Sequence, residues 1–437
     1  MLGLIYFVLQ CNNTQSIKQA NNTQFSVAIM CQVFRGGGLE RVTQLLATKL
    51  SVENIKVYLM TGPALHDDYK VPENNNIIRL EAFSELDWMH YPEPNEEHKI
   101  QMQNKNILLL KYAHQYNISV FICQEHWVHS HYSTINFLKD NGIKVVAIEH
   151  NFFLFPIHDN REYLFKLSQK TYPRLDALIC LSRVDVQIWR RIGVKNAIYF
   201  PNLLTFDPST IQQAPLTSQN ILMVGRFHQG QKQQHLAIEM MKYVVPHVNA
   251  TLQMVGDSYP DYMNRCQQLT YSLKLEDNIK FYQYQTNIAD FYRNASVLVM
   301  TSKTEGFPMV LIEAMAFGIP IVAFDLKFNE LWTDNEGLIA VPQGDIEQMG
   351  AEVVKLMKNE ELRREIGAKG RESLNRFKNE VTVDKWIRLL KGLVNEENVI
   401  EEIKKSEDKV EWEYAKEVLN HELKLIGREG YDFGIEM

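Results

Sequence analysis

The sequence predicts an α/β protein in which two Rossmann-like domains, each built on a parallel sheet, face one another across a cleft. Short β-branched runs alternate with helical patterns, a polar stretch interrupts this alternation near the middle, and the alternation then restarts. Alternating strands and amphipathic helices are typical of parallel sheets built from βαβ units. The chain has 437 residues and 45% hydrophobic content. At about 150 residues per domain it has room for two or three domains, and the single interruption favours two.

The strands and helices follow one another in a regular order. The first half contains the strand-like runs QFSVAIMC, NIKVYLM, ISVFIC, KVVAIEH, DALICLS and AIYF. After the polar stretch TFDPSTIQQAPLTSQ, the second half contains NILMVG, ATLQMVG, NIKFY, ASVLVM, IPIVAF and GLIAV. From Gln348 the pattern is helical, and one apolar helix face is expected to pack back on the body through Trp412, Tyr414, Ala415, Val418 and Leu419. We therefore predict a first domain at 1–205, a linker at 206–219, a second domain at 220–385 and a C-terminal helical extension at 386–437.

Composition restricts the class of protein. The net charge of -7 and the pI near 6.0 argue against a nucleic-acid binder with a general basic surface. The cysteines show no metal-binding spacing and are expected to be reduced core residues of a cytoplasmic protein; they are Cys11, Cys31, Cys123, Cys180 and Cys266. The opening MLGLIYFVLQ lacks a basic flank and a cleavage site, and no other segment approaches about 18 continuous apolar residues, which predicts a soluble chain. A basic aromatic patch, Trp189 to Arg191, leaves peripheral contact with the inner membrane face as an alternative to a solvated helix face.

The stretch TEGFPMVLIEAMAFGIPIVAFD, residues 304–325, carries the first candidate site. It follows the strand SVLVM and contains a loop and then a helix that Gly318 ends. Ligands bind outside the carboxyl ends of parallel strands, where this loop lies. Gly306 lets the backbone approach a ligand, and the N–H groups that open the helix favour an anion. Glu305 and Glu313 are expected on the same side, where two carboxylates suit a polyol.

A second candidate site lies in NILMVGRFHQGQKQQHLAIEMM, which predicts a strand, a turn beginning at Gly225, and a helix. Arg226 and Lys232 both lie in the turn. Two cations at the carboxyl end of a strand suit a diphosphate, with arginine as a bidentate donor and lysine as a point charge.

These strings resemble the family-4 retaining glycosyltransferases of the GT-B fold, and most of all their bacterial polysaccharide branch. The resemblance rests on GRF…K, SKTEGFPMVLIEAMAFGIPIVAFD and VPQGD, and runs from about Gly36 to Trp386. It implies that Glu313 binds the nucleotide ribose, that Glu305 contacts the donor sugar, and that Arg226 with Lys232 holds the diphosphate. It also implies that the backbone of Phe307, Pro308 and Met309 lines the phosphate and the sugar.

The first half offers weaker signals. In VFRGGGLERVTQLLATKL, Gly37 and Gly38 are similar to the first glycine loop of the family, which approaches the diphosphate or the acceptor. His150 closes a strand at the position where the family often has a histidine that reaches the donor sugar. The histidines of QEHWVHSHY, His126, His129 and His131, are either acceptor-side residues or structural ones, and the structural interpretation is favoured.

Three positions depart from the family pattern. Gln233 stands where the family has a glycine after the lysine, and LKFNELW reaches Glu330 without the usual Gly-Pro turn. Gln283 replaces a glycine near the expected base site. These departures bear on which nucleotide is bound and on the floor of the donor pocket.

The expected activity is transfer of a sugar, with retention, from a nucleoside diphosphate sugar to a glycan or lipid-linked acceptor in cell-surface polysaccharide synthesis. A UDP-linked donor is expected, with no other cofactor. The cleft motifs contain no Asp-x-Asp, so a metal-independent reaction is expected. Two alternatives remain open, a catalytically silent partner subunit of the same fold and a nucleotide-sugar epimerase.

Overall fold

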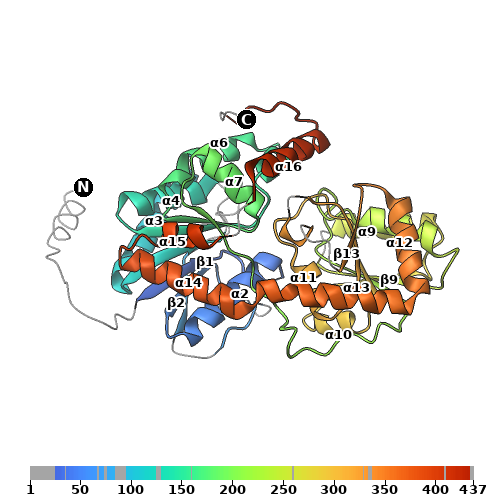
Figure 1. Cartoon of the computed structure of the whole chain (residues 1–437). Coiled ribbons are helices and arrows are strands. Elements are labelled where there is room, and N and C mark those ends of the chain that lie inside the picture. The colour runs from blue at the N-terminus through green and yellow to red at the C-terminus, as the bar shows by residue number, and fades with distance from the viewer. Residues whose placement is uncertain are drawn as a thin grey trace, which may run out of the picture.

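The computed structural model describes residues 25–34, 36–65, 68–72, 76–83, 95–124, 129–158, 160–257, 260–327, 329–332, 337–407 and 410–433. These residues form two α/β lobes that lie side by side (Figure 1). The predicted strand or leader at MLGLIYFVLQ lies outside them.

The first lobe is built on a seven-stranded sheet with the order β3-β2-β1-β4-β5-β6-β7, in which each recorded pairing is parallel. Its strands are β1 (Ser26–Met30), β2 (Lys56–Thr61), β3 (Ile77–Glu81), β4 (Ile118–Cys123), β5 (Lys144–Glu149), β6 (Ala177–Cys180) and β7 (Ala197–Tyr199). Its helices are α2 (Gly38–Val52), α3 (Glu96–Gln115), α4 (His129–Asp140), α5 (Phe155–His158), α6 (Glu162–Thr171), the 3-10 turn η2 (Tyr172–Arg174) and α7 (Arg183–Ile192).

The second lobe contains a six-stranded sheet with the order β10-β9-β8-β11-β12-β13, again paired in parallel. Its strands are β8 (Asn220–Val224), β9 (Thr251–Val255), β10 (Ile279–Tyr282), β11 (Val297–Met300), β12 (Ile321–Phe324) and β13 (Leu338–Val341). Its helices are α8 (Gln234–Val244), α9 (Pro260–Ser272), α10 (Ile288–Arg293), α11 (Met309–Ala316), η3 (Glu330–Trp332), α12 (Ile346–Lys358), α13 (Glu360–Ser373) and η4 (Leu374–Phe377). The two parallel sheets confirm the predicted fold class.

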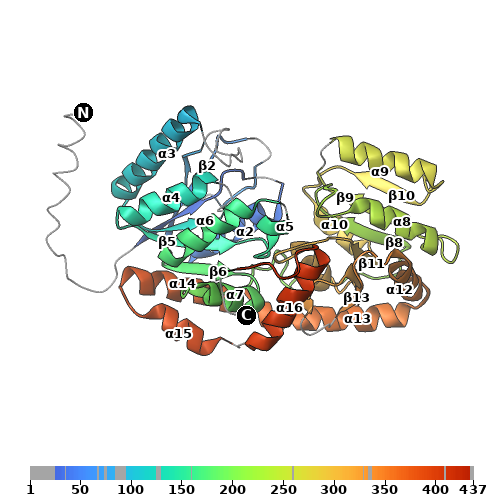
Figure 2. The ribbon, with the colours of Figure 1, turned by 90° about the horizontal axis from the view of Figure 1, so that it is seen from above.

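The C-terminal helices return to the first lobe. α14 (Asn379–Val394) packs on α2 and β4, α15 (Val399–Ser406) packs on β7, and α16 (Trp412–Leu425) packs on α7. Figure 2 shows α16 at the junction of the two lobes. Ala415, Val418 and Leu419 are buried in this packing, as expected, whereas Tyr414 is 40% exposed and does not belong to the buried face.

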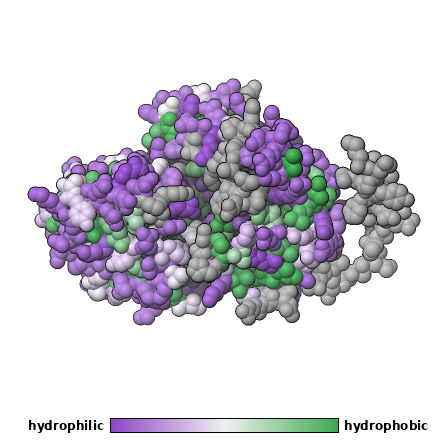
Figure 3. Space-filling view, turned by 180° about the vertical axis from the view of Figure 1, so that it is seen from behind, coloured by the Kyte–Doolittle hydropathy of each residue, from purple (hydrophilic) through white to green (hydrophobic). Residues whose placement is uncertain are grey.

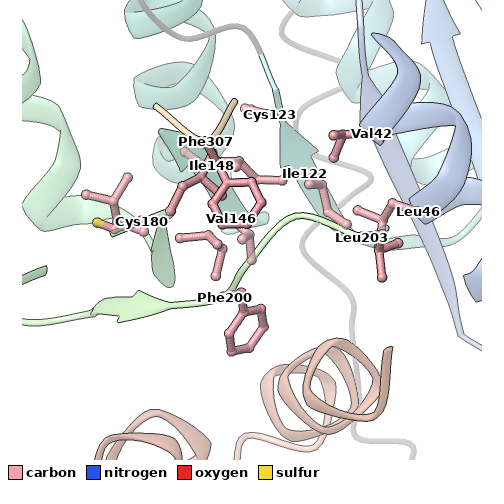
Figure 4. Packing of buried hydrophobic residues seen from close by; sticks show 14 of the residues in the cluster. Val42, Leu46, Ile122, Cys123, Val146, Ile148, Cys180, Phe200, Leu203 and Phe307 are labelled. Atoms are coloured by element: carbon pink, nitrogen blue, oxygen red, sulfur yellow. The ribbon is translucent and has the colours of Figure 1, made fainter. Parts of the chain in front are cut away.

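A continuous apolar core joins the first lobe to α11, η4 and the returning helices. Phe307, in the second lobe, belongs to the same buried cluster as Cys123 and Ile148 at the ends of two strands of the first lobe (Figure 4). Its ring also meets the Phe377 ring edge-on, with centroids 5.5 Å apart. The lobes are therefore held together by apolar packing.

The cysteines behave as expected where the structure describes them. Cys31, Cys123, Cys180 and Cys266 are free and buried, while Cys11 lies outside the described residues.

The sequence predicts that Trp189 lies in a surface patch on α7, and this prediction is wrong. This side chain is 1% exposed and stacks on Phe165, with ring centroids 5.7 Å apart. Arg190 pairs with Glu407 at 2.8 Å, and the Arg191 guanidinium lies 4.8 Å from the Trp412 ring centroid. The amphipathic pattern of α7 places tryptophan on the buried face, and the C-terminal segment contacts both arginines, of which Arg191 stays exposed.

Seen from behind, most of the described surface is hydrophilic, and hydrophobic residues gather mainly over the first lobe (Figure 3). Among the described residues, no helix combines the length and the apolar character needed to cross a membrane.

Candidate active site

The candidate site lies where loops after the strands of both sheets approach one another. In the first lobe these loops follow β1 and β5, and in the second lobe they follow β8 and β11. Because each sheet is parallel, the carboxyl ends of its strands lie on one edge. Three close approaches join the lobes here, at Gly306, Gly38 and Gly37.

Gly306 lies directly against the backbone of the first lobe. A Cβ atom built on it would be 2.0 Å from the His150 carbonyl oxygen and 3.2 Å from the Asn151 Cα. The Asn329 side-chain amide, which is fully buried, donates to the Gly306 carbonyl oxygen at 2.6 Å. Gly306 is thus fixed between the end of β5 and the loop after β12, and glycine is needed there for a close approach between domains.

Lys232 and Glu305 form an ion pair through Nζ and Oε1. The exposed fractions of the two side chains are 19% and 8%, so the pair is largely withdrawn from water. The Lys232 chain passes 3.7 Å from the position of a Cβ on Gly225. The diphosphate-side cation and the sugar-side carboxylate predicted from the sequence are therefore direct neighbours.

The turn that carries Lys232 explains one departure from the family pattern. Gln233 has φ 51° and ψ 46°, a left-handed conformation that glycine adopts without strain. The Thr301 hydroxyl donates to the carbonyl oxygens of Lys232 and Gln233, at 2.9 and 3.0 Å. The turn therefore keeps the backbone that a glycine would favour, held by a side chain at the end of β11.

Glu313 lies inside α11 and is 9% exposed. The Tyr292 hydroxyl donates to its Oε2 at 2.7 Å. Burial raises the pKa of Glu313, and the hydrogen bond from Tyr292 and the charge of Arg41 act in the opposite direction. The two predicted carboxylates therefore have different partners, Lys232 for Glu305 and Tyr292 for Glu313.

The glycine loop of the first lobe faces the second lobe. A Cβ built on Gly38 would meet the Met309 Cγ at 3.6 Å, an ordinary contact with the first residue of α11. A Cβ built on Gly37 would lie 3.2 Å from Arg226 Nη2 and 2.0 Å from Glu40 Oε2. Arg226 and both glycines were predicted as site residues, and they lie close together in the structure.

His150 is half-buried at the end of β5, and its Nε2 lies 2.5 Å from the Gln124 side-chain oxygen. The amide oxygen accepts, which places the donated proton on Nε2. Gln124 is fully buried and follows β4. The histidine is thus held in orientation beside the loop that contains Gly306.

The histidines of QEHWVHSHY do not form a described cluster. His131 is 3% exposed and meets the Phe83 ring edge-on at 6.2 Å, which fits the structural interpretation. His126 lies outside the described residues, as does the side chain of His129. Within the described part of the chain, no group of three or more His, Cys, Asp or Glu side chains has metal-binding geometry.

Glu330 joins the lobes. It is 4% exposed and accepts from the Arg183 backbone N–H at 2.5 Å and from Arg183 Nε at 2.9 Å. Arg183 opens α7. The loop without the Gly-Pro turn therefore holds Gly306 through Asn329 and the first lobe through Glu330.

Sequence reasoning missed several residues of this site. Asn329, Glu40, Arg41 and Tyr292 contact predicted site residues or lie among them, and Arg183 pairs with Glu330 in the loop that holds Gly306. The only local signal was for Glu40 and Arg41, which directly follow the glycine loop in GGGLER. The other three come from distant elements.

Comparison with known proteins places this geometry in a family. The model of Glycosyltransferase Family 4 matches residues 36–202, and the model of Glycosyl transferases group 1 matches residues 209–373. The chain therefore belongs to the glycosyltransferases that combine these two domains, and its paired parallel sheets are the GT-B fold.

Individual relatives are distant. Exopolysaccharide phosphotransferase SCO2592 of Streptomyces coelicolor is 29% identical over 231 residues, 51% of this chain and 24% of that protein. A Campylobacter jejuni protein, GalNAc-alpha-(1->4)-GalNAc-alpha-(1->3)-diNAcBac-PP-undecaprenol alpha-1,4-N-acetyl-D-galactosaminyltransferase, is 23% identical over 392 residues, 84% of this chain and 99% of that protein. The chain spans 24, 61, 39 and 42% of the length of the first four curated relatives it matches.

Among solved structures, Anabaena Alr3699/HepE in complex with UDP and glucose has a TM-score of 0.65 at 16% identity, covering 83% of this chain and 97% of that chain. At this identity the likeness concerns the fold.

Proposed function

We propose that the protein is a retaining hexosyltransferase. It moves a sugar from a UDP-linked donor to a glycan or lipid-linked acceptor in bacterial cell-surface polysaccharide synthesis. The observation that carries the proposal is the approach of Arg226 and the start of α11 to the glycine loop, with Lys232 beside Gly225. Cations and a helix N-terminus at one point suit a diphosphate.

Each residue then has a defined role. The diphosphate lies between Arg226, Lys232 and the N–H groups at Met309, and Glu313 accepts from the ribose hydroxyls. Glu305 accepts from hydroxyls of the transferred sugar. When the donor binds, the Lys232 ammonium turns from Glu305 to a phosphate oxygen, and the carboxylate becomes available to the sugar. His150, with its backbone against Gly306, lies on the sugar side.

Two relatives support the choice of substrates. The name of the Campylobacter jejuni relative specifies an undecaprenol-linked acceptor, and the Anabaena structure contains UDP and glucose. A lipid-linked acceptor would bring this cytoplasmic enzyme to the inner face of the membrane. The acceptor would enter from the first lobe, and the closed cleft would exclude the water that hydrolyses the donor.

Release of UDP from a panel of UDP-sugars, measured with and without glycan and lipid-linked acceptors, tests the function. A glycosyltransferase releases UDP faster with its acceptor. An epimerase converts the sugar without releasing UDP, and a silent partner subunit does neither. Release that no acceptor stimulates would contradict the proposal.

The reaction is expected to proceed without a metal ion. The negative charge that develops on the leaving diphosphate is stabilised by Arg226, Lys232 and backbone N–H groups. Activity should persist in excess EDTA, and neutralising both cations should lower turnover at least ~100-fold, since truncating one partner of a desolvated charge pair costs ~2 to 5 kcal/mol. Loss of activity in EDTA that manganese restores would contradict this mechanism.

A further inference from the structure

A buried carboxyl group, Glu40, occupies the glycine loop at the candidate diphosphate site. It lies in the first turn of α2 and is 8% exposed. Its Oε2 would be 2.0 Å from a Cβ at Gly37, so the absence of a side chain at that position makes room for the Glu40 carboxyl group. The point where this Cβ would lie is also 3.2 Å from Arg226 Nη2. Glu40 and Arg226 thus approach the same small volume from different lobes.

The groups around Glu40 stabilise its ionised form too little to offset the effect of burial. Burial raises the pKa of Glu40, and its own backbone N–H and the charge of Arg226 lower it by less. On the first lobe, the Tyr69 hydroxyl donates to the Gly37 carbonyl oxygen at 3.4 Å. Burial raises the pKa of Tyr69 most, Tyr284 of the second lobe raises it further, and Glu40 has the smallest effect. Arg41 on the same helix lies over the Tyr69 ring, 5.5 Å from its centroid. Among the residues that the structure describes, Arg226 is the cation of the second lobe whose charge acts on Glu40.

A diphosphate bound by Arg226 would change this balance. The diphosphate would form an ion pair with the Arg226 guanidinium, so that Arg226 would stabilise the Glu40 carboxylate less. It would also bring negative charge close to Glu40. Both effects favour the neutral acid. A neutral carboxylic acid has an O–H donor that can serve a phosphate oxygen. The same group that repels the ligand when ionised becomes a ligand-binding group when it holds a proton.

We propose that Glu40 is part of the diphosphate site and takes up one proton from solvent as a nucleoside diphosphate binds, with its O–H then donating to a phosphate oxygen. This inference rests on the proposed function, because it requires the diphosphate beside Arg226. The one bond that forms is the O–H bond on the Glu40 carboxyl group, and the buffer supplies its proton.

Calorimetric titration of the full chain with UDP tests the proposal. Measured in two buffers of different ionisation enthalpy at pH 7.5 to 8.5, the heat gives the number of protons taken up. Phosphate groups titrate near a pKa of about 6, so UDP itself contributes little in this range. We expect close to one proton per UDP, and an affinity that falls up to ~10-fold per pH unit.

Three variants locate the proton. Glu40→Gln keeps the shape and a donor but cannot titrate, so it should bind UDP without proton uptake and with an affinity that does not change with pH. Glu422→Gln neutralises another buried acid, in α16, and should retain the uptake of the wild type. Gly37→Ala, whose Cβ would displace the Glu40 carboxyl group, should lose it.

The outcomes distinguish a failure of the proposed role of Glu40 from a failure of the proposed function. UDP binding by the wild type without proton uptake, or full uptake by Glu40→Gln, overturns the role of Glu40 and leaves the proposed function standing. Failure of the wild type to bind any nucleoside diphosphate overturns the proposed function and the role of Glu40 with it.

Discussion

Replacing Gly306 by alanine tests whether the contact between the donor loop and the first lobe positions the reaction. The added Cβ would lie 2.0 Å from the His150 carbonyl oxygen and 2.7 Å from its carbon. An ordinary contact is about 3.4 Å, so one backbone must move by roughly 1.4 Å, which costs about 1 to 3 kcal/mol of stability as overpacking. The shift would also strain the hydrogen bond from Asn329. A misplacement of about 1 Å can cost 10²-fold in rate, so we expect kcat/KM to fall about 100-fold.

The assay is the acceptor-dependent release of UDP, with thermal unfolding measured in parallel. The matched control is Gly230→Ala in the same lobe, where the new Cβ meets only the His228 ring, at 3.4 Å; this variant should keep nearly all of the activity. A Gly306→Ala enzyme with wild-type kcat/KM would refute the reasoning, because it would show that the separation of the loop from His150 does not matter.

Three further predictions use other contacts of the site and its surroundings. Glu313→Ala should weaken UDP and UDP-sugar alike, by ten- to hundredfold, because hydrogen bonds to a charged acceptor contribute ~1.5 to 3 kcal/mol, whereas Glu305→Ala should spare UDP; calorimetry showing equal losses would mean that the roles are misassigned. Arg183→Ala leaves the buried Glu330 carboxylate without its ion-pair partner and should lower the free energy of unfolding by about 2 to 4 kcal/mol, an expectation that an unchanged denaturation midpoint would exclude. Burial, with a smaller effect from Asp325, raises the pKa of Glu422 to about 8. The folded state therefore holds a proton that the unfolded chain loses near pH 4.5, and stability should fall by roughly 2 to 4 kcal/mol as the pH rises from 5 to 8.5. Glu422→Gln should flatten that dependence, and an equally steep pH profile in the variant would rule the residue out.

Much of the architecture could be predicted from the sequence because parallel strands buried on both faces appear as short, continuous apolar runs. The run KVVAIEH, for example, became β5 (Lys144–Glu149) with His150 directly at its end. The loop around Glu305 and Gly306 was found because its glycine, proline and carboxylate spacing follows a strand and opens a helix. Local patterns of this kind depend on neighbours within about ten residues, and the sequence displays them directly.

The remaining features depend on contacts between distant segments. The amphipathic pattern around Trp189 indicates a buried face, but it does not indicate that Phe165 and the C-terminal segment will pack against α7. The pairing of Lys232 with Glu305 joins residues 73 positions apart, and the approach of Arg226 to Gly37 joins the two lobes. Such pairs are set by how the domains pack, which hydrophobic periodicity does not encode.

The central claim, that this cleft binds a nucleoside diphosphate, is tested most directly by thermal unfolding of the full chain with UDP, ADP, GDP and inorganic diphosphate. A ligand that binds only the folded state at a hundred times its Kd stabilises it by about 2.7 kcal/mol. We expect the nucleoside diphosphates to raise the midpoint far more than inorganic diphosphate, because Glu313 adds contacts to the ribose, and we expect UDP, the nucleotide of the proposed donor, to raise it most. Midpoints that no nucleoside diphosphate changes, even at millimolar concentration, would contradict the account.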